Sequence, residues 1–361
     1  MGSRHWFAVL WILATPGCAS VQKQGVDALN AYIDDARGAG LLNGNILVAD
    51  HGEVMLRRAV GYADGSGTLP LSLSDRFDIG SIAKEFDAVG ILMLAENGKL
   101  SLTDPVSKFV PGLPPWSDAV TIDELLHYTS GLPDVDWNTV EDDADNFRNL
   151  QALERLDFPA GTHYAYNNNN TFLRRRIIES ASGMSFRAFL ETQVFPKAGL
   201  RDPVIDPDEE TPRVAKGLDA EGKQDAMKVY LTGWTALTVD DLYRWSNCIT
   251  RFCLIGPQST LRIATTGDPS WQSGLGHVQM SGGRVVRHVH DGNDHYFQAL
   301  LMVDPTKGRT IILATSQNRN DVYAMADAIG AILDGKPYQP RRMTAKRAAL
   351  LVRQSTLHAT P

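Results

Sequence analysis

Ser81 and Lys84 stand three positions apart in the segment GSIAK, a spacing that places both side chains on one face of a helix. A serine hydroxyl becomes a nucleophile when a base takes its proton, and a lysine is such a base where burial lowers its pKa. The same spacing also occurs in solvated pairs on surface helices. Here Phe77, Ile79 and Phe86 make the surroundings apolar, which favours a catalytic pair.

Tyr166 and Asn168 lie in the segment PAGTHYAYNNNN. A tyrosine hydroxyl relays a proton when a nearby cation stabilises its phenolate form, and an amide side chain holds a substrate carbonyl in place. Runs of asparagine also favour polar turns, so this segment by itself is compatible with a plain loop.

A third candidate is His290-Asp291-Gly292, which we expect at the end of a strand. A glycine there lets a substrate lie close to the strand backbone. The next amide, that of Asn293, then becomes an oxyanion donor together with the amide of Ser81.

Strand patterns occur near both ends of the chain. An early hairpin is predicted around the turn at His51-Gly52, and a late group of β-branched runs follows Gly274. The predicted strands cover residues 45–50, 53–62, 284–290, 296–304 and 309–316.

Helical patterns occupy the middle of the chain and its last ordered segment. One helix is predicted from Gly80 to Asn97, and others over residues 170–182 and 321–333. This order predicts an α+β fold class: an antiparallel sheet from both chain ends, flanked by helices, with a mainly helical region inserted at about 100–235.

The two ends of the chain differ from the rest. Residues 1–19 carry Arg4, an apolar run over 6–14 and then small residues, which is the layout of a secretory signal peptide. This predicts a periplasmic or secreted protein. Two alternatives are a buried N-terminal helix and a lipoprotein anchored through Cys18.

The formal net charge of the 361 residues is −7, which disfavours a nucleic-acid partner. After the first twenty residues no apolar run is long enough to cross a membrane. A basic tail over residues 336–361 is either solvated or in weak contact with a membrane surface. Its cations are Lys336, Arg341, Arg342, Lys346, Arg347 and Arg353.

Export would leave two cysteines, Cys248 and Cys253, in an oxidising compartment that favours a disulfide between them. Two buried free thiols are the alternative.

Taken in order along the chain, these motifs resemble the serine β-lactamase and penicillin-binding-protein superfamily. The similarity is to the branch with class C β-lactamases, D-alanyl-D-alanine carboxypeptidases, D-aminopeptidases and related esterases. It spans residues 26–335 and rests on six segments: FDIGSIAKEF, GKLSLTDP, TSGLP, PAGTHYAYNN, FPKAGL and the strand with H-x-G.

The resemblance implies a fold of the β-lactamase and transpeptidase type and a two-step hydrolysis through an acyl-enzyme, without cofactor or metal. It assigns Ser81 as the acylated nucleophile, with Lys84 and Tyr166 sharing the general-base work. Asn168 would orient the substrate, and His290 would stand beside the tyrosine where relatives often have lysine.

Trp234 either walls the acyl pocket or is a core aromatic. Ser130, in TSGLP, we interpret as part of a structural turn because Gly131 and Pro133 flank it.

The third motif departs from the β-lactam-active members, in which a lysine and a hydroxyl grip a substrate carboxylate. His290 is followed by Asp291, which repels a carboxylate if it points inward, although strand alternation can turn it away. We therefore expect small esters or amides, peptides included, as substrates. The alternatives are a β-lactamase or D-alanyl-D-alanine carboxypeptidase and, more distantly, a non-catalytic acyl-serine sensor.

A metal site is a further alternative, because His288 and His290 share a strand face near Asp291 and His295. Only His277 lies in the same strand region, and such clusters are more often structural, so no metal is expected.

Overall fold

The computed structural model describes residues 16–338 except 220, 226–230 and 318–321, with the backbone alone for 16–22. It forms two compact units, one over residues 40–326 and the other over the described parts of 1–39 and 327–361. Most of the predicted leader and most of the basic tail lie outside the described residues.

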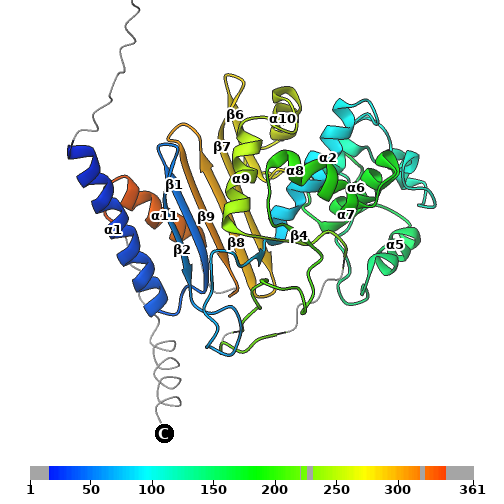
Figure 1. The fold of residues 1–361 in the computed structure, drawn as a ribbon. Helices are drawn as coiled ribbons and strands as arrows, with labels where there is room; N and C mark the ends of the chain where they lie inside the picture. The colour runs from blue at the N-terminus through cyan, green and yellow to red at the C-terminus, as the bar shows by residue number, and fades with distance from the viewer. Residues whose placement is uncertain (1–15, 220, 226–230, 318–321, 339–361) are drawn as a thin grey trace, which may run out of the picture. The chain divides into compact units, whose positions relative to one another are not determined.

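The larger unit is built on a six-stranded antiparallel sheet, shown in Figure 1. The N-terminal hairpin joins the C-terminal strands because β1 pairs with β9, with Gly44 opposite Thr315. The strand order is β2 (Glu53–Val60), β1 (Gly44–Asp50), β9 (Arg309–Thr315), β8 (Phe297–Asp304), β7 (Arg284–Asp294) and β6 (His277–Ser281). Both chain ends thus contribute to one sheet, as predicted.

Two interior strands of this sheet, β1 and β9, are buried along their whole length. Their sequences, GNILVAD and RTIILAT, are accordingly apolar runs without alternation, which is typical of a strand covered on both faces.

In the chain, a mainly helical region separates the two groups of strands, and Figure 1 shows it beside the sheet. Side-chain caps begin several of its helices: Thr121 and Glu124 form a capping box, and Asn167 caps α6. The larger helices are α2 (Lys84–Glu96), α4 (Ile122–His127), α5 (Asp143–Ala152), α6 (Asn168–Ser182), α9 (Val239–Thr250) and α10 (Pro257–Ala264). The shorter ones are α3 (Trp116–Ala119), α7 (Phe186–Phe189) and α8 (Phe195–Ala198).

A second, three-stranded sheet has the order β3 (Phe77–Asp78), β5 (Thr235–Leu237) and β4 (Val204–Ile205). It ties the start of α2 to the segment that carries Trp234, because Phe77 pairs with Leu237.

The smaller unit contains α1 (Pro16–Gly38) and most of α11 (Val322–Leu333). In it, the rings of Tyr32 and Tyr338 meet edge to face at 5.4 Å. Among the residues that the structure describes, no helix is both long and apolar enough to span a membrane.

The predicted elements differ from the observed ones mainly at their ends. The strand β7 continues to Asp294, so the third motif lies inside a strand and not at its end. The strand β6 is an additional edge strand, and a 3₁₀ turn over Gly80–Ala83 precedes α2. The α+β fold class is confirmed.

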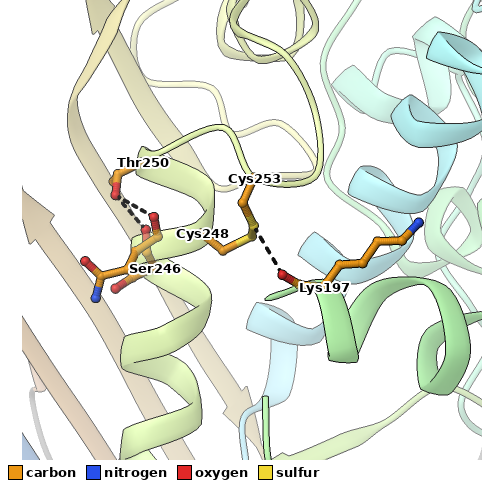
Figure 2. Close-up of a disulfide and its surroundings, with 6 residues drawn as sticks. Lys197, Ser246, Cys248, Thr250 and Cys253 are labelled. Atoms are coloured by element: carbon orange, nitrogen blue, oxygen red, sulfur yellow. Dashed lines mark hydrogen bonds between the residues drawn. A yellow bond between two sulfur atoms is a disulfide. The ribbon is translucent and has the colours of Figure 1, made fainter. Parts of the chain in front are cut away.

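Cys248 and Cys253 form a disulfide, with Cα atoms 5.0 Å apart. Figure 2 shows Cys248 in the last turn of α9 and Cys253 in the loop that follows, 3.9 Å from the carbonyl oxygen of Lys197. The bridge therefore closes the C-terminal end of the helix that carries Trp245.

Candidate active site

The proposed nucleophile lies in a tight turn between β3 and α2. Gly80 has φ +53°, a left-handed conformation that glycine adopts without strain, and its N–H donates to Asp78 Oδ1 at 2.7 Å. The next residue, Ser81, is thereby placed at the entrance to the helix.

Ser81, Lys84 and Tyr166 meet at one point. Lys84 Nζ lies 2.9 Å from Ser81 Oγ, and the Tyr166 hydroxyl donates to the same oxygen at 2.8 Å. Lys84 Nζ is also 5.4 Å from the centroid of the Tyr166 ring. The structure therefore brings the three predicted catalytic side chains within hydrogen-bonding distance.

The electrostatics of the site shift Lys84 toward its neutral form. Burial lowers the pKa of Lys84 to about 8, since a charged amine is poorly solvated there. Burial also raises the pKa of Tyr166 to about 12, although part of its ring faces solvent. Near neutral pH the tyrosine is therefore a proton donor, and an appreciable fraction of Lys84 is a free base.

Tyr166 is positioned by the loop that contains the TSGLP motif. The Ala165 N–H donates to the carbonyl oxygen of Tyr128 at 2.9 Å, and the Tyr128 ring packs on that of Tyr166 at 4.8 Å. Ser130 is fully buried and donates to Asn170 Oδ1 at 2.7 Å, which agrees with a structural role for this serine.

Asn168 begins α6 and is held by an aspartate that sequence analysis did not single out. Its backbone N–H and its Nδ2 both donate to Asp134 Oδ1, at 2.7 and 3.2 Å. Asn168 lines a small cavity together with Lys84 and Trp234. The position of Asp134 directly after TSGLP is the signal that could have found it.

Gly292 and Asn293 lie against the nucleophile turn. A Cβ added to Gly292 would be 1.8 Å from the Ile79 carbonyl oxygen and 3.0 Å from the Ser81 amide nitrogen. A Cβ on Gly80 would be 2.5 Å from the Asn293 amide nitrogen. Only glycine permits this approach, which brings the amides of Ser81 and Asn293 close together.

His290 occupies a different setting from the one expected. Its side chain is 1% exposed, and its Nδ1 lies 2.8 Å from Glu85 Oε1. His288 Nε2 lies 2.8 Å from the same oxygen, while the Trp245 indole donates to Oε2 at 2.5 Å. The ring therefore braces β7 against α2, because strand alternation points it into the buried layer.

Burial opposes ionisation of Glu85, but the charges of His288 and His290 and their hydrogen bonds outweigh it and lower its pKa to about 2. Sequence analysis missed Glu85. An acidic residue directly after Lys84 in an otherwise apolar helix could have indicated a buried carboxylate with partners. In the described part of the chain, no three His, Cys, Asp or Glu side chains are placed to hold a metal ion.

Asp291 lies on the opposite face of β7 from His290 and Gly292 and accepts a hydrogen bond from the Tyr323 hydroxyl at 2.7 Å. Strand alternation thus turns it away from the buried layer, which was one of the two orientations considered.

A buried ion cluster lies beneath the lysine. Arg174 Nε donates to Asp87 Oδ1 at 2.5 Å and Arg175 Nε lies 3.6 Å from Asp87 Oδ2, with Asp87 and Arg174 fully buried. Both arginines oppose protonation of Lys84, whereas Asp87 favours it. Sequence analysis did not find this cluster, because Arg174, Arg175 and Arg176 are consecutive and only packing distinguishes them.

A second buried acid lies beside the nucleophile turn. Burial first, and the Asp294 carboxylate second, raise the pKa of Asp78 to about 8. Asp78 also accepts the hydrogen bond from the Gly80 N–H. The protonation state of Asp78 therefore affects the turn that carries Ser81.

A serine and a lysine at the start of a buried helix, with a tyrosine from a separate loop and an antiparallel sheet beside them, are features of serine β-lactamases and penicillin-binding proteins. The family model described as Beta-lactamase matches residues 29–335. The chain belongs to that family and so to the serine hydrolase superfamily that includes the penicillin-binding proteins.

Individual relatives and solved structures are consistent with this family assignment. Penicillin-binding protein 4* of Bacillus subtilis (strain 168) is 28% identical over 345 residues, covering 84% of this chain and 75% of the relative. The penicillin-binding protein from Bacillus halodurans has a TM-score of 0.73 at 24% identity, covering 83% of this chain and 98% of the other. D-alanine carboxypeptidase AmpC from Burkholderia cenocepacia has a TM-score of 0.70 at 20% identity, covering 88% and 99%. The likeness to these two structures is one of fold.

Proposed function

We propose that the protein is a serine hydrolase that cleaves small esters or amides through an acyl-enzyme on Ser81. The observation that carries this proposal is the convergence of Lys84 Nζ and the Tyr166 hydroxyl on Ser81 Oγ, at 2.9 and 2.8 Å. A hydroxyl held between a base and a proton donor is prepared for nucleophilic attack.

In the first step the neutral Lys84 accepts the Ser81 proton while Oγ attacks the substrate carbonyl carbon. The amides of Ser81 and Asn293 stabilise the oxyanion that forms. Tyr166 then protonates the leaving group as the carbonyl re-forms, and the proton on Lys84 restores the tyrosine.

In the second step water attacks the acyl-enzyme and gives its proton to the same base. The acid is released and Ser81 recovers its hydrogen. The Asn168 amide orients the substrate next to its carbonyl group. His290 does not touch the substrate but helps to hold β7 in place.

The preference for esters or amides without a carboxylate rests on His290, which stands where β-lactam-active relatives carry a lysine and is buried against Glu85. Asp291 adds no repulsion, because it lies on the other face of β7 and accepts from Tyr323. The alternative is a β-lactamase or D-alanyl-D-alanine carboxypeptidase, which the similarity to penicillin-binding protein 4* keeps open. The distant alternative is a sensor that acylates and does not turn over.

A labelling experiment tests the proposal. A fluorophosphonate should label the purified protein at Ser81, nitrophenyl esters should show a burst followed by turnover, and Ser81→Ala should abolish both. Labelling without turnover would identify a sensor, and fast turnover of a chromogenic cephalosporin would favour the β-lactamase alternative.

We also propose that the chain is exported, with residues 1–19 removed. The leader pattern and the Cys248–Cys253 disulfide support this, because disulfides persist in oxidising compartments. Mass spectrometry of the protein isolated from its host should find a first residue of Ser20. An acylated Cys18 would support the lipoprotein alternative.

A further inference from the structure

Four consecutive asparagines, residues 167–170, stand at the start of α6, and three of their side-chain oxygens accept hydrogen bonds from the protein. The Oδ1 atoms of Asn167, Asn169 and Asn170 accept from the Asn170 N–H, Asn146 Nδ2 and the Ser130 hydroxyl, at 3.1, 2.9 and 2.7 Å. Three of the four amide oxygens are therefore committed to contacts within the protein.

The amide of Asn168 is used on its nitrogen side only. Its Nδ2 donates to Asp134 Oδ1 at 3.2 Å, and the same aspartate oxygen accepts from the Asn168 backbone N–H at 2.7 Å. Within the residues that the structure describes, no group donates to Asn168 Oδ1. Because the side chain is partly exposed, this oxygen is available to a bound molecule.

Asp134 determines which end of the Asn168 amide faces it. A carboxylate accepts hydrogen bonds and does not donate them, so it selects the nitrogen end of an amide. Turning the amide end for end would lose this bond and place two acceptor oxygens against each other. Asp134 is itself held in place, because its Oδ1 also accepts from the Val135 N–H at 2.8 Å. Its charge is also favoured at the positive end of the α6 dipole.

The Asn168 side chain lies beside the nucleophile turn. Asn168 follows two residues after Tyr166, whose hydroxyl donates to Ser81 Oγ at 2.8 Å. It also lines the same small cavity as Gly80 and Lys84, which stand before and after Ser81 in the chain. A group next to the carbonyl of an acylated Ser81 is therefore within reach of this side chain.

Resting on the acyl-enzyme function proposed above, we infer that Asp134 is a positioning residue that makes Asn168 a hydrogen-bond acceptor toward the substrate. Asn168 Oδ1 then binds an N–H donor next to the scissile carbonyl, as N-acylated amino acids and peptides carry. An acyl group without such a donor displaces water from Oδ1 and leaves that oxygen unpaired, which makes it a poorer substrate.

The test compares p-nitrophenyl esters of N-benzyloxycarbonyl-glycine, N-benzyloxycarbonyl-sarcosine and both enantiomers of N-benzyloxycarbonyl-alanine. The sarcosine ester has a methyl group on nitrogen and no N–H, whereas the alanine esters are its isomers and keep the N–H. Wild type should hydrolyse the glycine ester and the better alanine ester with a kcat/KM about tenfold above that of the sarcosine ester, the loss expected for one unmade hydrogen bond. Equal values for the glycine and sarcosine esters would overturn the inference.

Variants at two positions identify the groups responsible. Asn168→Ala should abolish the preference for the glycine over the sarcosine ester. Asp134→Ala frees the amide to turn and should reduce the preference by about threefold or more, whereas Asp134→Asn keeps an acceptor oxygen and should retain it. Full preference in Asp134→Ala would show that the aspartate does not set the amide.

Asp136→Asn is the matched control. It changes another exposed aspartate of the same loop, whose carboxylate accepts from Asn138 and Thr139, and it should leave the preference unchanged. The preference is a ratio of two kcat/KM values from one preparation, so partial unfolding of a variant lowers both values and leaves the ratio as it was.

The inference and the proposed function fail in different ways. Equal turnover of the glycine and sarcosine esters would refute the inference and leave the acyl-enzyme mechanism standing. Absence of turnover with every ester, together with no fluorophosphonate labelling of Ser81, would refute both. If Asn168→Ala slows the glycine and sarcosine esters equally, the amide donates to a substrate carbonyl through its second N–H, and the inference is wrong.

Discussion

Gly292 and Ile79 approach so closely that a Cβ on Gly292 would lie 1.8 Å from the Ile79 carbonyl oxygen. We expect Gly292→Ala to push β7 away from the nucleophile turn and to lower kcat/KM about a hundredfold, as a displacement of about 1 Å does. Nitrophenyl ester kinetics measure this. Gly38→Ala, where an added Cβ meets nothing within 4 Å, is the control. Wild-type kinetics in Gly292→Ala would show that the Asn293 amide is not needed.

Lys84→Ala should slow acylation of Ser81 by about a hundredfold or more, because it removes a positioned base. The burst phase with p-nitrophenyl acetate measures acylation directly, and circular dichroism should show an unchanged fold. Lys108→Ala removes an exposed lysine that pairs with Asp104 and should have no effect. A burst at the wild-type rate in Lys84→Ala would assign the base elsewhere.

The rate of acylation should rise with pH and level off above about 8, because Lys84 acts as a base only after losing its proton, and burial lowers its pKa to about 8. Tyr166, with a pKa raised to about 12, should cause no loss of activity between pH 8 and 10. The profile of kcat/KM against pH measures both effects.

Asp78 has a pKa raised to about 8 as well, so Asp78→Asn is the necessary control for that profile. If Lys84 is responsible, the rise of kcat/KM persists in Asp78→Asn. Its disappearance would identify the aspartate as the titrating group.

Glu85→Gln should lower the free energy of unfolding by about 2–3 kcal/mol, since hydrogen bonds to a charged group contribute about 1.5–3 kcal/mol. The amide cannot accept at both ends from His288, His290 and Trp245. Urea denaturation measures the loss. Glu96→Gln, at the exposed end of the same helix, removes a charge that accepts from Gly256 and Ser259 and should cost less. Equal losses would mean that burial of the Glu85 network is unimportant.

Several features followed from local sequence alone because their causes are local. Three-residue spacing placed Ser81 and Lys84 on one face at the start of a helix, where Nζ and Oγ lie 2.9 Å apart. The strand patterns over residues 45–50 and 309–316 likewise predicted β1 and β9, although they could not say which strands pair.

Other features required tertiary structure, because they join residues that are distant in the chain. Tyr166 reaches Ser81 across 85 positions, and Glu85 reaches His290 across 205. The secondary-structure preference of a segment does not depend on whether a distant partner exists. For this reason sequence analysis assigned His290 to substrate binding, whereas packing places it against Glu85. Local spacing therefore determined which groups could do chemistry, and long-range packing decided which of them meet, because burial and partner choice depend on the assembled sheet and helices.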